Sequence, residues 1–273
     1  MTPAAPTIER AYARLPHGQM HYATCGDVQA PAVLLLHQTP RSWAEYRAVL
    51  PLLGASCRAI AMDTAGFGES DPVPEPSIEA WAEAAAQLLA VLRIERCHVV
   101  GHHTGGVIAV ELAARHASRV GALVLSSTPF TNPAFRAARA QRPAIDAVEP
   151  SADGSHLARL WRQRQGFYPA DRPDLLHAFV LDALKVRGDL EAGHRAVAAY
   201  RMEDRIASIQ QPTLVIRATD DPFAAPHAAD WLAHLPQAQV VDIAGGTVPL
   251  PDHLPQAFAD AVLRFLHRVR DQC

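Results

Sequence analysis

Residues 97–106 hold the residue types and spacing best suited to chemistry in this sequence. They read as a short apolar strand, a tight turn and the start of an apolar helix. Gly101 and Gly105 frame His103 with the spacing G-x-H-x-G, which matches the nucleophile-elbow pattern G-x-S-x-G except at its centre. Such a turn holds its central residue in a strained conformation that exposes the side chain. The sequence therefore predicts a catalytic turn in which His103 replaces the usual serine.

An imidazole in this position has two chemical options. The positive end of the helix dipole disfavours the imidazolium cation and keeps the ring neutral. A neutral imidazole can act as a general base or as a nucleophile near neutral pH. The competing interpretation is that His103 is a relic in an inactive pocket, because a fold does not fix a function.

The elements that must position His103 follow a strand–helix alternation. Residues 32–36 are a continuous apolar run, as expected for a strand buried on both faces of a parallel sheet. Ser77 and Glu79 mark the start of an amphipathic helix. Beside the strand before His103, the predicted elements are a hairpin at 8–25, strands at 32–36, 57–62, 122–127, 212–216 and 239–243, and helices at 42–53, 77–92 and 255–269. This pattern predicts an α/β fold with an open, mostly parallel, doubly wound sheet and a site at the carboxyl ends of its strands.

The alternation stops between residues 131 and 205, where the sequence is helical and rich in arginine. We predict that residues 131–205 form an inserted helical cap, which separates two core segments, 1–130 and 206–273. This predicted insertion is called the cap segment below.

The cap segment also carries aromatic residues and histidines. Trp161, Phe167 and Tyr168 are predicted to line the roof of a substrate pocket, although packing within the cap is the simpler role for such residues. The cap histidines are expected mostly to face solvent, with room for one to reach the pocket; they are His156, His177 and His194.

Composition gives little reason to expect macromolecular partners. The formal net charge is -3 over 273 residues, which indicates neither a nucleic-acid nor an anionic-membrane partner. Four widely spaced cysteines predict neither a disulfide framework nor a zinc site. No apolar run is long enough to span a bilayer, and the first six residues do not read as a signal peptide. We expect a cytoplasmic protein of unspecified oligomeric state, with a homodimer as one option, and a small-molecule substrate.

The motifs together resemble the α/β-hydrolase superfamily, in its capped branch of epoxide hydrolases, haloalkane dehalogenases, esterases and C–C hydrolases. Residues 37–40 stand where such proteins carry H-G-x-P, and residues 63–71 are similar to their D-x-x-G-F-G-x-S-D loop. Residues 101–105 match G-H-S-x-G except at the serine. The resemblance covers essentially the whole chain outside the cap segment and implies the α/β-hydrolase fold.

The resemblance also implies which positions form the catalytic triad. Asp221 lies where the family has its acid, and Thr247 lies where the family has its histidine. The triad positions would therefore hold His103, Thr247 and Asp221, which cannot perform the usual transfer of a serine proton to histidine. Asp221 is predicted to orient His103. Thr247 is either inert, a hydrogen-bond partner of His103, or a weak nucleophile that His103 activates.

Further site residues follow from the same resemblance. The backbone N–H groups of Thr39 and Thr104 are expected to bind developing negative charge on a substrate oxygen. Gln38 replaces the family glycine and either crowds this oxyanion hole or adds an amide to it. His37 is expected to brace its loop, and His102 to be packed rather than catalytic. We expect neither a metal nor another cofactor, because the neighbouring His102 and His103 on a turn point in different directions and do not form an H-x-x-x-H spacing with each other or with His37.

The sequence thus predicts an enzyme that acts on a small carbonyl-containing substrate without a cofactor or a serine nucleophile. Hydrolysis through an activated water, C–C cleavage, decarboxylation and elimination are all compatible with His103. The alternative is a protein that binds or senses a small molecule and has lost catalysis.

Overall fold

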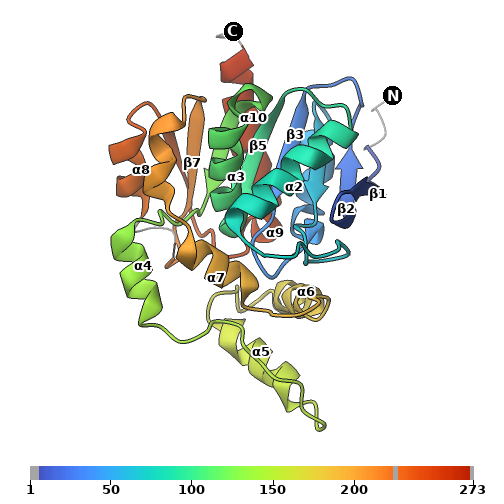
Figure 1. Cartoon of the computed structure of the whole chain (residues 1–273), viewed down its shortest axis with the longest axis vertical. Helices are drawn as coiled ribbons and strands as arrows, with labels where there is room; N and C mark the ends of the chain where they lie inside the picture. Colours follow the sequence, from blue (N-terminus) through green and yellow to red (C-terminus); the bar gives the residue numbers. More distant parts are fainter. Residues whose placement is uncertain (1–5, 224–226, 271–273) are drawn as a thin grey trace.

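An eight-stranded sheet runs through the computed structural model, which describes residues 6–223 and 227–270. The strand order is β1-β2-β4-β3-β5-β6-β7-β8, and β2 is antiparallel to both β1 and β4 while the other pairs are parallel. The strands are β1 Glu9–Leu15, β2 Gly18–Cys25, β3 Ala32–Leu36, β4 Arg58–Met62, β5 Cys97–His102, β6 Val120–Ser126, β7 Thr213–Ala218 and β8 Gln239–Ile243. The predicted mostly parallel α/β sheet is confirmed (Figure 1).

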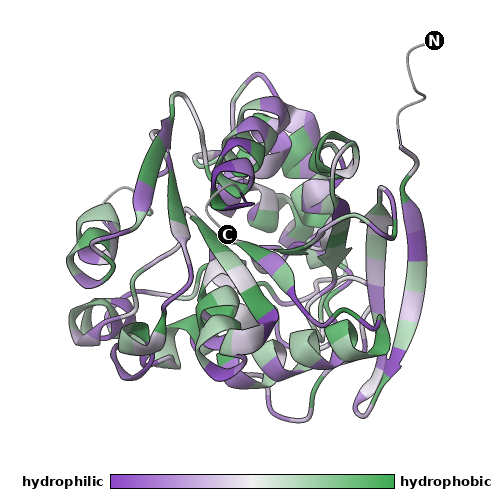
Figure 2. Ribbon diagram, turned by 90° about the horizontal axis from the view of Figure 1, so that it is seen from above, coloured by the Kyte–Doolittle hydropathy of each residue, from purple (hydrophilic) through white to green (hydrophobic). Residues whose placement is uncertain are grey.

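Helices cover both faces of this sheet. On one face α2 packs beside α3, and on the other α1 packs beside α10. Their apolar sides and the strands form two buried clusters, one on each face of the sheet, and the central strands are predominantly hydrophobic (Figure 2). These helices are α1 Val49–Gly54, α2 Ile78–Val91, α3 Thr104–Arg115 and α10 Pro255–Arg270. Ser77 caps α2 as predicted, since its hydroxyl accepts the N–H of Ala80 at 3.1 Å.

One predicted helix is divided in two. Instead of a continuous helix over 42–53, the chain forms a short 3₁₀ turn, Trp43–Tyr46, followed by α1. The N–H of Trp43 donates to the buried Asp63 carboxylate at 2.6 Å, and the Tyr46 hydroxyl donates to the carbonyl of Leu36 at 2.8 Å. These tertiary hydrogen bonds hold the turn against the ends of β3 and β4, which local helix propensity does not reveal.

The cap segment contains four helices and a small apolar cluster of its own. The helices are α4 Pro133–Ala140, α5 Ser155–Gln165, α6 Pro173–Ala183 and α7 Ala192–Ala199, and α5 and α6 lie away from the sheet in Figure 1. The buried guanidinium of Arg41 links this segment to the rest of the chain: it donates to Asp182 of α6 at 2.9 Å and to Asp252 at 2.7 Å. Asp252 lies in α9, Leu250–His253. A charge buried in this way needs such partners.

Two further predictions concern membranes and cysteines. None of the helices in the described ranges is both long and apolar enough to cross a membrane. Cys25, Cys57 and Cys97 are buried free thiols, and Cys273 lies outside the described residues.

Candidate active site

His103 occupies the turn between β5 and α3 with φ 47° and ψ −114°. Positive φ is uncommon for residues other than glycine and marks local strain. The surrounding contacts hold the turn in place: the N–H of His103 donates to the Ser126 carbonyl of β6 at 2.9 Å, and its carbonyl accepts the N–H of Gly106 at 2.9 Å. The predicted elbow geometry is therefore present around an imidazole.

The two framing glycines are required by close approach of the backbone. A Cβ atom on Gly105 would lie 1.9 Å from the Leu36 carbonyl oxygen, and one on Gly101 would lie 2.2 Å from the Gly105 carbonyl oxygen. Any side chain at either position would push α3 away from the strands. The glycines thus fix the position of His103 relative to β3.

Asp221 lies directly behind His103. It follows β7, is fully buried, and its Oδ2 is 2.7 Å from His103 Nε2. The contact is close, but the ring N–H is not directed at this oxygen well enough to make a regular hydrogen bond. The other oxygen, Oδ1, accepts the N–H of Phe223 at 2.9 Å. Burial raises the pKa of Asp221, but the neighbouring His103 and the Phe223 N–H outweigh burial and lower the pKa overall.

This pairing determines which nitrogen of His103 is free. With Nε2 against a carboxylate, the favoured neutral tautomer carries its proton on Nε2 and leaves a lone pair on Nδ1. No described residue hydrogen-bonds Nδ1, and His103 lines the large cavity described below. The ring of His102 meets the His103 ring edge-on at 4.6 Å between centroids and limits its rotation.

Thr39 and Thr104 lie beside His103, and their hydroxyl oxygens are 2.9 Å apart. Both residues line the cavity. Neither backbone N–H donates to another group in the described part of the chain. These features match those expected of an oxyanion hole, in which unpaired N–H groups are available to donate hydrogen bonds to a negatively charged oxygen.

Gln38 is held by a buried carboxylate. Its backbone N–H donates to Glu45 Oε2 at 2.9 Å, and its side-chain amide donates to Glu45 Oε1. Burial raises the pKa of Glu45 to about 7, although Arg41 and Gln38 act to lower it. Because its amide nitrogen is occupied, Gln38 contributes its remaining surface to the cavity wall.

His37 and His102 are structural. His37 Nδ1 lies 2.7 Å from the Gln38 carbonyl, and its Nε2 accepts the N–H of Thr64 at 2.9 Å, so the ring braces two loops as expected. His102 is fully buried, with Nε2 2.8 Å from the Val248 carbonyl and Nδ1 3.0 Å from the Ser126 hydroxyl. Burial, reinforced by His103, lowers the pKa of His102 to about 3. Both nitrogens of each ring are occupied, so neither ring has a free nitrogen for a substrate, as expected for residues that brace a loop or pack in the interior.

Thr247 does not pair with His103. Its hydroxyl is 2.9 Å from Nδ1 of His253, which lies six residues later in α9. The loop after β8 folds onto its own following helix, and this local contact satisfies the hydroxyl. The hydrogen bond to His103, one of the three roles considered for Thr247, is therefore not formed.

A cavity of about 670 Å³ opens in front of His103. It lies between the loops at the carboxyl ends of the strands and the cap segment. The residues lining it include Gln38, Thr39, His103, Thr104, Asn132, Phe135, Arg139, Arg142, Gln163, Phe167, His194, Phe223 and His227.

The three predicted roof aromatics take different positions. Phe167 lines the cavity and packs against Phe223, with 4.8 Å between ring centroids. Trp161 and Tyr168 do not line it: Tyr168 is buried against Phe179, and Trp161 packs on the same cluster of the cap segment. Their prediction as pocket residues is wrong because α5 and α6 need these rings to bury an apolar cluster of their own.

Two further histidines line the cavity, one from the predicted cap histidines and one that was not predicted. His194 is the cap histidine that reaches the cavity; its Nε2 lies 2.8 Å from Asp146 Oδ2. His227 follows Asp221 by six residues and was missed. Its place on the loop of the predicted acid was the only signal in the sequence that pointed to it.

Asp146, Glu191 and His194 bring ligand-type atoms within 4.8 Å of one another in the described part of the chain. Arg164 is paired with both oxygens of Asp146. Burial raises the pKa of Asp146, but Arg164 and His194 outweigh it and bring the pKa to about 2. The cluster is thus an ion-pair network in which Arg164 pairs with Asp146 and which joins α5 to α7.

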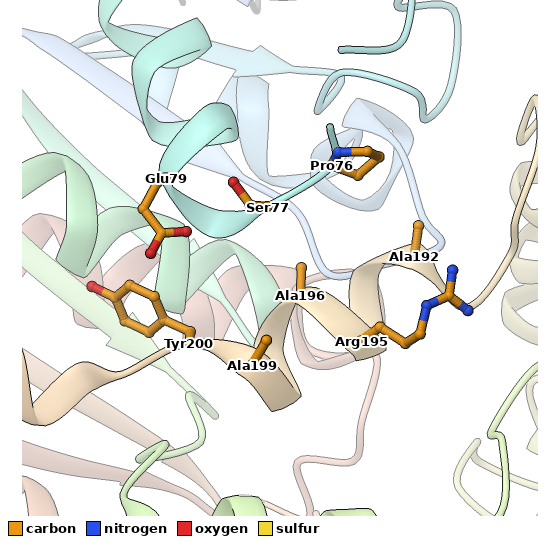
Figure 3. A pocket seen from close by; sticks show the side chains of 8 residues that line it. All are labelled: Pro76, Ser77, Glu79, Ala192, Arg195, Ala196, Ala199 and Tyr200. Atoms are coloured by element: carbon orange, nitrogen blue, oxygen red, sulfur yellow. The ribbon is translucent and has the colours of Figure 1, made fainter. Parts of the chain in front are cut away.

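A smaller cavity of about 340 Å³ lies between the start of α2 and α7 (Figure 3). Its polar lining consists of Ser77, Glu79, Arg195 and Tyr200. Ser77 is occupied as the cap of α2. This groove shares no lining residue with the cavity at His103, so we place the site at His103.

Comparisons with known proteins agree with this topology. A family model described as "alpha/beta hydrolase fold" matches residues 31–253. Epoxide hydrolase 3 from Xenopus tropicalis is 33% identical over 114 residues, which cover 41% of this chain and 31% of that protein. A 2-hydroxy-6-oxononadienedioate/2-hydroxy-6-oxononatrienedioate hydrolase from Paraburkholderia xenovorans is 32% identical over 221 residues, or 75% of each chain. Among solved structures, the enol-lactonase from Burkholderia xenovorans LB400 aligns with a TM-score of 0.77 at 25% identity, over 94% of this chain and 100% of that one.

Proposed function

The chain belongs to the α/β-hydrolase fold family, and from this we propose that it is a cofactor-independent enzyme of the capped branch that acts on small carbonyl-containing molecules without a serine nucleophile. The observation that carries the proposal is the 2.7 Å contact between His103 Nε2 and the buried Asp221 carboxylate at the elbow. A carboxylate behind an imidazole fixes its tautomer and stabilises its protonated form, as in serine hydrolases. In this protein the imidazole of that pair stands at the position of the serine nucleophile. It therefore acts on water or on the substrate directly, and not through a serine hydroxyl.

In the hydrolytic form of this mechanism, His103 Nδ1 either takes a proton from a water molecule whose oxygen bonds to the carbonyl carbon, or bonds to that carbon itself. The carbonyl π electrons move to oxygen, where the N–H groups of Thr39 and Thr104 stabilise the negative charge. Collapse of this intermediate expels the leaving group. In the water route the leaving group takes the proton from His103. In the direct route the acyl group stays on Nδ1 until a water molecule attacks it, which releases the acid and restores the imidazole. In the C–C cleavage, decarboxylation and elimination routes, His103 acts as the base and no acyl group is transferred to the protein.

The substrate class is supported by the names of the similar proteins. The matched 2-hydroxy-6-oxononadienedioate hydrolase and the matched enol-lactonase are both named for carbonyl compounds. The cavity of about 670 Å³ suits a small organic molecule. Cytoplasmic location and a homodimer remain predictions from the sequence.

Hydrolysis of 4-nitrophenyl acetate, followed by release of 4-nitrophenolate, tests the proposal with a simple carbonyl substrate. We expect turnover that survives dialysis against EDTA. Lack of turnover on this ester and on a panel of enol lactones and vinylogous diketones, with ligand-induced thermal stabilisation retained, would instead favour the non-catalytic binding protein.

Fluorophosphonate probes are not expected to label a serine of this protein, because labelling requires a hydroxyl activated by a neighbouring base and His103 occupies that position. Intact-mass and peptide mass spectrometry after incubation would detect an adduct. A serine hydrolase of the same fold, treated in parallel, is the positive control. One-to-one labelling of a serine at the cavity would refute the non-serine mechanism.

Phe167→Ala is expected to raise KM for 4-nitrophenyl acetate by about 10-fold with little change in kcat, because the ring supplies apolar contact to the ligand rather than chemistry. Leu157→Ala is the matched control, since Leu157 lies on the exposed side of α5 and does not line the cavity. Equal KM values for both variants would show that the cap segment does not form the pocket roof.

A further inference from the structure

A second imidazole, His227, faces the same cavity as His103. It immediately precedes α8, Ala228–His234, and its ring meets Phe135 edge-on at 5.7 Å between centroids. Asp221 and His227 both lie in the connection between β7 and α8. The charges of both Asp221 and His103 influence the pKa of His227, so the three groups share one electrostatic environment.

The two ring nitrogens of His227 have different surroundings. Nδ1 is buried and has no hydrogen-bond partner in the described ranges; its neighbour is Asp230 Oδ2 at 3.8 Å. Nε2 makes no hydrogen bond to a described residue. The side chain is 17% exposed, and His227 lines the cavity.

These surroundings select a tautomer. A bare lone pair on buried Nδ1 would face a carboxylate and be repelled, whereas an N–H there is attracted to it. The proton therefore belongs on Nδ1, which leaves the lone pair on Nε2, the ring nitrogen that is not buried. Burial lowers the pKa of His227, although Asp230 and Asp221 act to raise it, and this keeps the ring neutral.

We propose, building on the function proposed above, that His227 Nε2 and His103 Nδ1 together hold the attacking water, which makes His227 a second catalytic residue. A water molecule has two hydrogens, and two fixed acceptors can bind both of them. A lone pair of the water oxygen then points at the carbonyl carbon of a substrate whose oxygen lies at the N–H groups of Thr39 and Thr104. A single acceptor would leave the water free to rotate.

The water oxygen bonds to the carbonyl carbon, one water proton moves to His103 Nδ1, and the carbonyl π pair becomes the oxyanion. The other proton stays on oxygen, hydrogen-bonded to His227 Nε2. Reformation of the carbonyl breaks the bond to the leaving group, which receives the proton from His103. This assignment makes His103 a base rather than a nucleophile.

The tautomer prediction can be tested without any substrate. In protein labelled with ¹⁵N-histidine, long-range ¹H–¹⁵N spectra at neutral pH should show His227 as the Nδ1–H tautomer, with its signals identified by their loss in His227→Phe. A His227 ring that carries its proton on Nε2, or that is charged at neutral pH, would overturn the proposal. The tautomer of His103, read in the same spectrum, tests the His103–Asp221 pairing separately.

Kinetics supply the second test. His227→Phe keeps the ring volume and removes the acceptor, and we expect kcat for 4-nitrophenyl acetate to fall by about 10- to 100-fold with KM nearly unchanged. His234→Phe is the control, since His234 lies on the exposed side of the same helix and outside the cavity. A stoichiometric burst of 4-nitrophenolate with an acetyl group on His103 would refute the water route while leaving His103 essential. Unchanged kcat in His227→Phe, with activity lost in His103→Ala, would refute only the role of His227.

Discussion

His103→Ala is expected to lower kcat for 4-nitrophenyl acetate by about 10²- to 10⁴-fold, the range associated with loss of a general base. The methyl group that remains can neither accept a proton nor attack a carbonyl. The oxyanion donors and the cavity are untouched, so substrate binding should persist and the loss should fall on kcat.

The fold should survive this substitution, because the His103 side chain contributes to the site rather than to either apolar cluster of the sheet. Circular dichroism and a thermal melt would check this. His103→Asn is a useful second variant, since asparagine tolerates positive φ better than alanine does but is not a base. If either variant kept most of the wild-type kcat, the chemistry would not depend on the elbow residue.

Asp221→Asn is expected to lower kcat by about 10²- to 10⁴-fold as well, by way of the tautomer of His103. An asparagine amide can turn its NH₂ toward Nε2, which then becomes an acceptor and forces the ring proton onto Nδ1. With a proton on Nδ1, this nitrogen would have no lone pair to accept a proton at the cavity. Replacing the acid of serine proteases by asparagine has the same effect on the histidine tautomer. The lowered pKa of Asp221 keeps the carboxylate charged at neutral pH, so the wild-type pairing is intact there.

Asp220→Asn is the matched control for this variant. Asp220 is the neighbouring acid and is exposed, and among the described residues its carboxylate accepts a hydrogen bond from the Thr219 hydroxyl alone, at 2.9 Å. We expect its kcat to equal that of the wild type. Equal kcat values for the two asparagine variants would show that Asp221 does not orient His103.

The architecture could be predicted closely because parallel strands buried on both faces are continuous apolar runs. The strands at 32–36 and 239–243 have the predicted bounds, and α10 differs from its prediction by one residue. The turn at His103 could also be predicted, because Gly105 lies so close to Leu36 that no side chain fits at position 105. Residue types alone are sufficient to predict a local structure where its backbone geometry admits only one residue type.

The sequence by itself also placed His103 and Asp221 in one site, because both follow strands whose carboxyl ends meet at one edge of the sheet. Only the tertiary structure decided what each polar group touches. It paired Thr247 with His253, buried Tyr168 within the cap segment, tied Gln38 to Glu45 and brought His227 to the cavity. These outcomes depend on contacts between residues far apart in the chain or on the path of a loop, and the periodicity of a sequence carries information about neither.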